Sequence, residues 1–200
     1  MTNTVQKTNM RNQLLSVAAD LFSAHGYQAV GVRDIAKYLG INPGSIYNHV
    51  ESKQILLYEL IEETLYNLIN DTRKHINKKG SHLSRLEKFI QIFFNFNTQY
   101  PGQMLVVSRE KHNLNPQQKS DISARYTEYL ILLEQILKGV LPQHTHHGVP
   151  HLARTILAFL FGQLLFQEFA LSNISLTEFI TRLVLIGGSR QSIMSVESHP

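Results

Sequence analysis

The residues from position 44 to position 49 have the types and spacing that contact with a nucleic acid requires. They follow Asn42-Pro43, which is typical of a helix N-cap with proline at the first helical position. With Ile46 and Val50 assigned to the core, the outward face of this short helix consists of Gly44, Ser45, Tyr47, Asn48 and His49. The N–H groups at the helix start suit a phosphate, as do the donors of Tyr47 and His49. Ser45 and Asn48 are short enough to reach base edges in a major groove.

Four histidines form the other group whose residue types could do chemistry, namely His144, His146, His147 and His151. A metal sensor needs ligands held in a fixed geometry with a supporting second shell of hydrogen bonds. His144, His146 and His147 lie between Pro142 and Pro150, and His151 follows directly, without cysteine and with few carboxylates nearby. We therefore expect a solvated loop with no metal or other cofactor, and a metal-responsive regulator that uses this loop is the alternative.

Helical periodicity along almost the whole chain predicts an all-α fold. Three short helices end near Gly26, Gly40 and Val50, and the tight connection from Leu39 to Pro43 is what a helix-turn-helix requires. A long fourth helix follows a cap at Ser52, and Lys53 at its head is expected to point its ammonium at the DNA backbone. We place the module boundary here, between a DNA-binding module of residues 1–52 and a longer helical module of residues 53–200.

The later helices are expected at about residues 83–98, 104–112, 116–137, 151–171 and 176–194, which gives about nine helices in all. The helix at about residues 151–171 is apolar nearly all round, as a helix buried between two chains would be. The core of a monomer is the alternative interpretation.

Composition limits the classes of protein that the chain can represent. It has 200 residues, a formal net charge of +4 and no cysteine, which excludes disulfides and thiolate metal sites. No apolar run reaches the roughly 18 residues of a membrane span, and the polar first ten residues do not resemble a signal peptide. We expect a cytoplasmic protein without a membrane partner, whose positive charge suits a polyanion.

Motifs of common catalytic sites are missing from the sequence. It has no nucleophile elbow, no phosphate-cradling glycine loop and no two-histidine metalloprotease spacing. We therefore expect no enzyme activity. A helical interaction protein that does not bind DNA remains the alternative to a DNA-binding regulator.

The stretch from Arg11 to Lys53 resembles the DNA-binding domain of the TetR family of transcriptional regulators. The residues that carry the resemblance are Leu14-Leu15, Ala18, Leu21-Phe22, Gly26-Tyr27, Val32-Arg33-Asp34-Ile35-Ala36, Leu39-Gly40-Ile41, Pro43-Gly44-Ser45-Ile46-Tyr47 and Ser52-Lys53. The resemblance implies a homodimeric repressor of double-stranded operator DNA with an N-terminal helix-turn-helix and a C-terminal helical domain. It also implies DNA contacts from Arg33, besides Lys53 and the face described above.

The sequence departs from the family pattern at two places. Gly31 stands where the family usually has a serine or threonine that caps the second helix and touches phosphate. Glycine caps only weakly and brings no hydroxyl to that contact. Val50 and Glu51 stand where the family usually has phenylalanine and proline, and valine still fills a core position.

The resemblance implies that the last two helices pair with their copies in a second chain as a four-helix bundle. The residues expected at this interface are Leu152, Ile156, Phe159, Gln163, Gln167, Phe179, Leu183 and Ile186.

The C-terminal domain is expected to bind a small, largely apolar effector. The candidate residues are Phe93, Phe94, Tyr100, Met104, Arg109, Tyr126, Tyr129, Phe159 and Phe166. The segment that begins with Arg109-Glu110 resembles relatives that sense acyl-coenzyme A or other lipid-like thioesters, with these charges at a pocket mouth. An exposed, salt-linked loop is the alternative for Arg109-Glu110. Effector binding is expected to move the fourth helix and so release the operator.

Overall fold

A computed structural model describes residues 2–76, 80–142, 148–165 and 177–185 of the chain. These residues form an all-helical fold, as the periodicity predicts, with no strand in the ranges described. The elements are α1 (Thr2–His25), α2 (Val32–Leu39), α3 (Pro43–Ile46), α4 (Lys53–His75), α5 (His82–Gln99), α6 (Pro101–Arg109), the 3-10 helix η1 (Lys111–Asn113), α7 (Pro116–Val140) and α8 (Gly148–Gln163). Residues 177–185 are also helical. Within the described ranges, no helix is long and apolar enough to cross a bilayer.

The chain divides into two compact units. The first unit comprises residues 1–68 and 99–126, and the second comprises residues 69–98 and 127–200. Both α4 and α7 therefore contribute residues to each unit. These two units do not coincide with the functional division expected at residue 52, because the first unit also contains α6, η1 and the beginning of α7.

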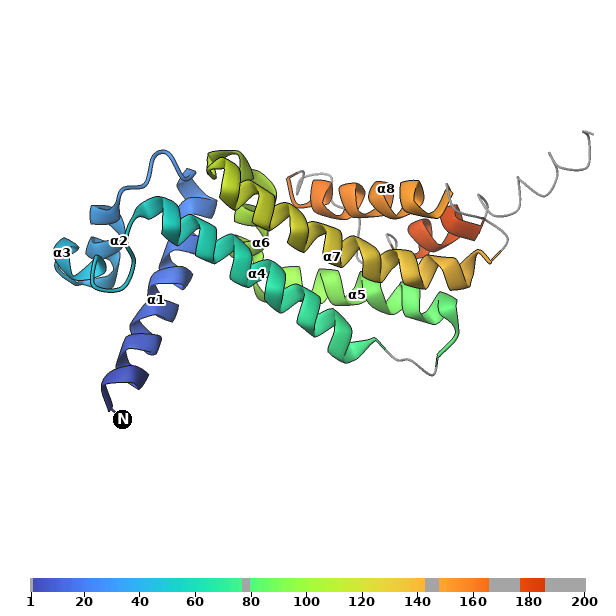
Figure 1. The fold of residues 1–200 in the computed structure, drawn as a ribbon, viewed down its shortest axis with the longest axis horizontal. Helices are drawn as coiled ribbons and strands as arrows, with labels where there is room; N and C mark the ends of the chain where they lie inside the picture. The colour runs from blue at the N-terminus through green and yellow to red at the C-terminus, as the bar shows by residue number, and fades with distance from the viewer. Residues whose placement is uncertain (1, 77–79, 143–147, 166–176, 186–200) are drawn as a thin grey trace, which may run out of the picture. The chain divides into compact units, whose positions relative to one another are not determined.

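The helix-turn-helix lies in the first unit, with α1, α2 and α3 following one another closely (Figure 1). Gly26 and Gly40 have φ values of 83° and 66°, so glycine is needed at both helix ends. The Asn42 side-chain oxygen accepts a hydrogen bond from the Gly44 N–H at 2.9 Å, which confirms the predicted cap.

The end of α3 corrects the sequence prediction. The helix ends at Ile46 instead of extending to Val50. The backbone tightens there to bonds between residues three apart, such as the one from the His49 N–H to the Ile46 carbonyl at 2.8 Å. Val50 is still buried, so its predicted place in the core is confirmed.

Buried apolar side chains join the helices of the first unit. Phe22, Ile35, Ile46 and Leu56 are fully buried, and each comes from a different helix of α1 to α4. Helix α6 packs on α1 at Gly102, where a Cβ would lie 3.4 Å from the Ala19 carbonyl oxygen. The helix-turn-helix is thus supported by α4 and α6.

The second unit has an aromatic core. The rings of Phe89 and Tyr129 are stacked with centroids 4.7 Å apart, and both side chains are fully buried. Phe93 packs edge-to-face on Phe161 at 5.1 Å. These contacts join α5 to α7 and α8.

Candidate nucleic-acid interface and effector site

The polar face of α3 and of the turn after it points away from the protein. Tyr47 is 58% exposed, and Gly44 and Asn48 are also exposed, whereas Ile46 is fully buried. Ser45 and His49 are half-buried. The α3 face is therefore free to meet a groove of DNA, although contact of these residues with DNA stays a prediction.

The start of α2 is capped by the Asp34 carboxylate. Asp34 accepts a hydrogen bond from the Gly31 N–H at 2.7 Å, while glycine has no side chain with which to cap the helix. The carboxylate takes the place near the positive helix end that a phosphate would favour. Arg33 next to it is exposed, so a DNA contact in this region would come from Arg33.

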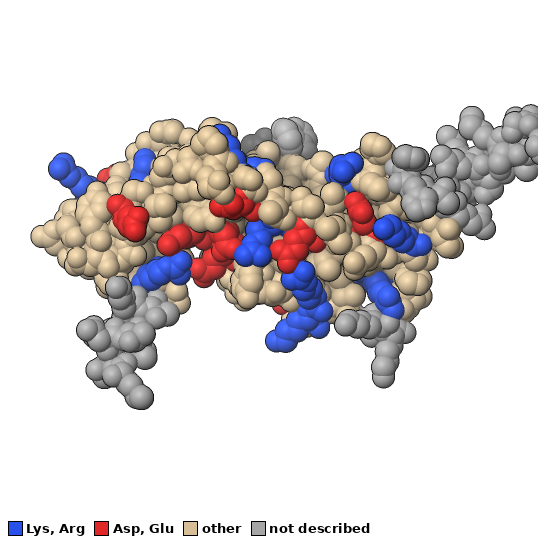
Figure 2. All heavy atoms as spheres, in the orientation of Figure 1, with Lys and Arg blue, Asp and Glu red and all other residues tan. Residues whose placement is uncertain are grey.

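Few charged side chains lie over α2 and α3 on the face drawn in Figure 2. Recognition by this surface would therefore depend more on hydrogen bonds from Tyr47 and its neighbours than on a dense positive field.

Lys53 does not point freely toward the solvent, which corrects the sequence-based expectation for its ammonium. Its Nζ donates to the carbonyl of Tyr27 at 3.0 Å and to that of Val30 at 2.9 Å. It also lies 4.3 Å from the centroid of the Tyr27 ring. Because an ammonium has three N–H donors, one donor remains for a phosphate, and that contact stays a prediction.

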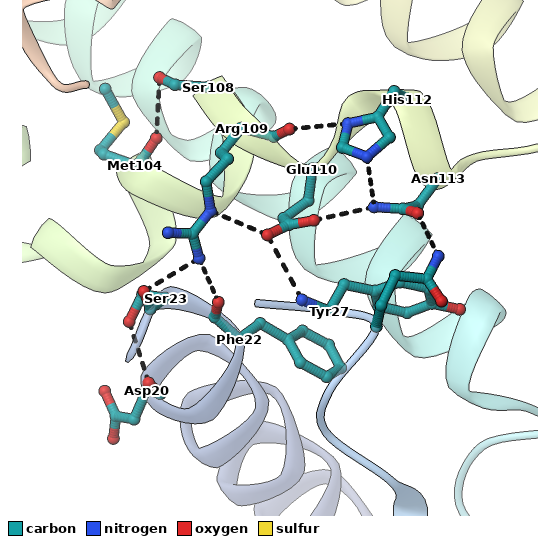
Figure 3. Close-up of polar contacts among 11 residues, drawn as sticks. Asp20, Phe22, Ser23, Tyr27, Met104, Ser108, Arg109, Glu110, His112 and Asn113 are labelled. Atoms are coloured by element: carbon teal, nitrogen blue, oxygen red, sulfur yellow. Dashed lines mark hydrogen bonds and ion pairs between the residues drawn. The ribbon is translucent and has the colours of Figure 1, made fainter. Parts of the chain in front are cut away.

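Arg109 and Glu110 lie on the helix-turn-helix side of α6, as Figure 3 shows. The Arg109 guanidinium donates to the carbonyls of Phe22 and Ser23, and Glu110 is only 4% exposed. Glu110 is too buried for the alternative of an exposed loop, and the expected place of the two charges at a pocket mouth stays a prediction. The salt link between the two side chains is present at 2.9 Å.

The other predicted effector residues divide between the two units. Phe93, Phe94, Tyr129 and Phe159 belong to the second unit, and Tyr100, Met104 and Tyr126 to the first. Phe93, Tyr129 and Met104 are fully buried core residues. Phe166 lies outside the described residues. Their role in ligand binding stays a prediction.

Burial governs the chemistry of the two candidate tyrosines. It raises the pKa of Tyr129 and of Tyr126 well above the ordinary value, because a phenolate loses its hydration inside the protein. Tyr126 donates its hydroxyl proton to the Val107 carbonyl at 3.3 Å. Both side chains are therefore neutral, and Tyr129 accepts a hydrogen bond from the Thr72 hydroxyl at 3.5 Å.

The second unit contains a cavity of about 580 Å³. It is lined by Arg73, Arg85, Leu132, Gln135 and Ile136, from α4, α5 and α7, and by Ile76, which follows α4. None of these residues is among the predicted effector residues, because the cavity depends on how three helices pack and not on an aromatic pattern. Arg73 is paired with Glu128 at 2.7 Å.

The described part of the predicted dimer surface is apolar and partly exposed. Phe179 is 45% exposed and Leu183 is 51% exposed on the helix of residues 177–185. Ile156 is buried, and Leu152, Phe159 and Gln163 are half-buried on α8. Gln167 and Ile186 lie outside the described residues. Exposed aromatic and aliphatic side chains of this kind favour an interface.

The predicted histidine cluster lies largely outside the described residues, which include His151 but not His144, His146 or His147. Among the residues that the structure does describe, no group of three or more metal-ligating side chains is found. The metal-responsive alternative is therefore untested.

Sequence reasoning missed one exposed aromatic residue of the helix-turn-helix. Tyr38 on α2 is 63% exposed and lies next to the exposed Lys37. Its place at the end of a short helix, directly before Leu39-Gly40, is the sequence signal that could have drawn attention to it.

Comparisons with known proteins agree with this architecture. Residues 14–60 match the family described as bacterial regulatory proteins, tetR family. The chain is 31% identical over 112 residues to the HTH-type transcriptional repressor KstR2 of Mycobacterium tuberculosis (strain CDC 1551 / Oshkosh), covering 56% of each chain. The chain thus spans about half the length of the curated relatives it matches.

Solved structures share the fold over most of the chain. A bacterial regulatory protein in the tetR family from Rhodococcus RHA1 has a TM-score of 0.78 at 19% identity, covering 87% of this chain and 96% of that one. FadR from Bacillus subtilis in complex with stearoyl-CoA has a TM-score of 0.72 at 21% identity, covering 86% and 96%. The match to the tetR family model therefore covers residues 14–60, and the solved structures show that most of the chain shares their all-helical fold.

Proposed function

We propose that the chain is a homodimeric transcriptional repressor that binds a near-palindromic operator and is released from it by an acyl-coenzyme A or a similar lipid-like effector. The observation that carries the proposal is the exposed α3 face, led by Tyr47, on a helix-turn-helix of the TetR family. In a dimer, two such faces enter successive major grooves about 34 Å apart. Such a regulator acts on the chromosome and not as an enzyme, so we also propose a cytoplasmic location.

The proposed DNA contacts divide by chemistry. Arg33, Tyr47, His49 and Lys53 donate to phosphates and set the position of the protein on the duplex. Ser45 and Asn48 contact base edges, and Gly44 allows a close backbone approach. The two cationic contacts in each chain, from Arg33 and Lys53, make binding weaken as the salt concentration rises.

The proposed effector class follows from the cavity of the second unit. Its aliphatic side chains, among them Leu132 and Ile136, suit an acyl chain, and its two guanidinium groups suit phosphates or a carboxylate. The relative FadR, whose structure contains stearoyl-CoA, supports this class of ligand. An effector of this kind releases DNA only if it binds the DNA-incompetent state more tightly.

The experiment that tests the proposal is selection of duplexes from a random-sequence library by the full-length protein, followed by binding measurements across salt concentrations. A two-fold symmetric sequence bound by a dimer with a steep salt dependence is the expected result. Failure to select any sequence would contradict the proposal and favour a helical interaction protein. Stearoyl-CoA, with coenzyme A alone as the control, is then the probe for release from the selected duplex.

A further inference from the structure

We infer that Arg109 and Glu110 are positioning residues for DNA binding, because they fix the loop between α1 and α2 to the end of α6 and so set the orientation of the helix-turn-helix. The inference rests on the proposed function, since that orientation matters only if α3 must fit a groove. All residues concerned belong to the first unit.

Arg109 holds the C-terminal end of α1. Its Nη2 donates to the Phe22 carbonyl at 2.5 Å and to the Ser23 carbonyl at 2.9 Å, while its Nε donates to Glu110 Oε1 at 2.9 Å (Figure 3). The last carbonyls of a helix carry the negative end of its dipole and have few intrahelical partners, although the Phe22 carbonyl also accepts a hydrogen bond from the Gly26 N–H at 2.9 Å. The planar guanidinium contacts both carbonyls and the carboxylate at once, which the single ammonium of a lysine does less well.

Glu110 holds the loop itself. Its Oε1 accepts a hydrogen bond from the backbone N–H of Tyr27 at 3.3 Å, and its Oε2 accepts one from the Asn113 side chain at 2.8 Å. Asn113 in turn accepts a hydrogen bond from the Gln28 side chain. A carboxylate that is only 4% exposed is costly unless it keeps such partners. The contact therefore resists sliding of α6 past the loop.

Tyr27 in this loop is bound by α4 as well as by the end of α6. The Tyr27 N–H is bonded to Glu110 after α6, and the Tyr27 carbonyl is bonded to Lys53 at the start of α4. A shift of α6 relative to α4 would pull on Tyr27 from two sides and turn the loop that leads into α2.

The test uses the full-length protein and a duplex that the wild-type chain selects from a random-sequence library. Arg109→Lys and Glu110→Ala are each expected to lower the affinity for this duplex about tenfold. The variant Arg109→Lys keeps the charge, so we expect an unchanged salt slope. Amide hydrogen exchange in residues 26–30 is expected to accelerate in both variants while the middle of α4 stays protected.

The matched control is Arg125→Lys, which alters the ion pair with Glu62 at 2.6 Å in the same unit and is expected to leave the affinity within about twofold. Wild-type affinity or wild-type exchange in Arg109→Lys would overturn the inference and leave the proposed function intact. If Glu110→Ala does not fold, Arg109→Lys alone decides. A wild-type protein that selects no duplex would overturn the proposed function and the inference together.

Discussion

Lys53 and Tyr27 are joined by two contacts of different kinds. The ammonium donates to the Tyr27 carbonyl at 3.0 Å and lies 4.3 Å from the centroid of the Tyr27 ring. Tyr27 is 8% exposed, and its burial raises the pKa of its hydroxyl, so the ring offers a neutral face to the cation. The first residue of α4 therefore fixes the loop that enters α2, in addition to any contact with DNA.

Replacement of Lys53 separates these two roles. For Lys53→Ala we expect the free energy of unfolding to fall by about 1–3 kcal/mol, because two carbonyls lose a charged donor and the ring loses its cation. We also expect the salt slope of operator binding to fall by about one, through loss of a phosphate contact. Urea unfolding and binding titrations at several salt concentrations measure the two effects.

Lys53→Arg is the control for Lys53→Ala, since it keeps the positive charge and should keep the slope. An unchanged slope in Lys53→Ala would show that Lys53 acts only inside the protein. Unchanged stability would show that the two carbonyl contacts contribute little.

Signals close together in the sequence predicted most of the helix-turn-helix. The bounds of α2, the cap at Asn42 and the start of α4 after Ser52 depend on residues within a few positions of one another. The predicted burial of Ile46 and Val50 is likewise a matter of local periodicity.

The partners of the charged residues could not be predicted in this way. Arg109 contacts Ser23, which is 86 residues away in the chain, and Lys53 contacts Tyr27 across 26 residues. Such pairs depend on how α6 and α4 pack on α1. Hydrophobic periodicity shows which face of a helix is buried but does not show which other helix covers that face. The cavity near Arg73 escaped prediction for the same reason, because three helices separated in sequence line it.

Tyr47→Phe should weaken binding to the selected duplex by about 1 kcal/mol or more, since the variant loses only a hydroxyl that can donate to phosphate. The side chain is 58% exposed, so the thermal midpoint should not change. Fluorescence anisotropy with labelled duplex measures the affinity.

Tyr38→Phe is the matched control for Tyr47→Phe, because Tyr38 is 63% exposed on the neighbouring helix and is not among the predicted contacts. We expect its affinity to equal that of the wild type. Equal losses in the two variants would contradict a special role for the α3 face.

Leu183→Arg should shift the protein from dimer to monomer, because it places a charge in the apolar surface that we assign to the interface. Light scattering after size-exclusion chromatography measures the mass at several concentrations. Ile131→Arg is the control, since Ile131 on α7 is 47% exposed, close to the 51% of Leu183, but lies outside the predicted interface. A dimer that survives Leu183→Arg but not Ile131→Arg would place the interface on α7.

Tyr129→Phe should make the protein more resistant to alkali. Burial raises the pKa of Tyr129 in the folded state, whereas in the unfolded chain the group titrates near its ordinary value of about 10. Above that value the unfolded state loses its proton first, so the stability that the neutral phenol provides is present below pH 10 and declines as the pH rises further. Above pH 10, each buried tyrosine of this kind lowers the free energy of unfolding by about 1.4 kcal/mol for every further pH unit. Tyr129→Phe removes one such tyrosine.

Urea unfolding from pH 8 to pH 11 tests the alkaline behaviour of Tyr129→Phe. At pH 8 both states of the wild-type tyrosine are neutral, and the variant loses only the long contact of 3.5 Å with the Thr72 hydroxyl, worth less than about 1 kcal/mol. The curves of variant and wild type should therefore converge or cross as the pH rises. Parallel curves over the whole range would mean that the Tyr129 hydroxyl reaches water in the folded protein, which would contradict its burial in the core of the second unit.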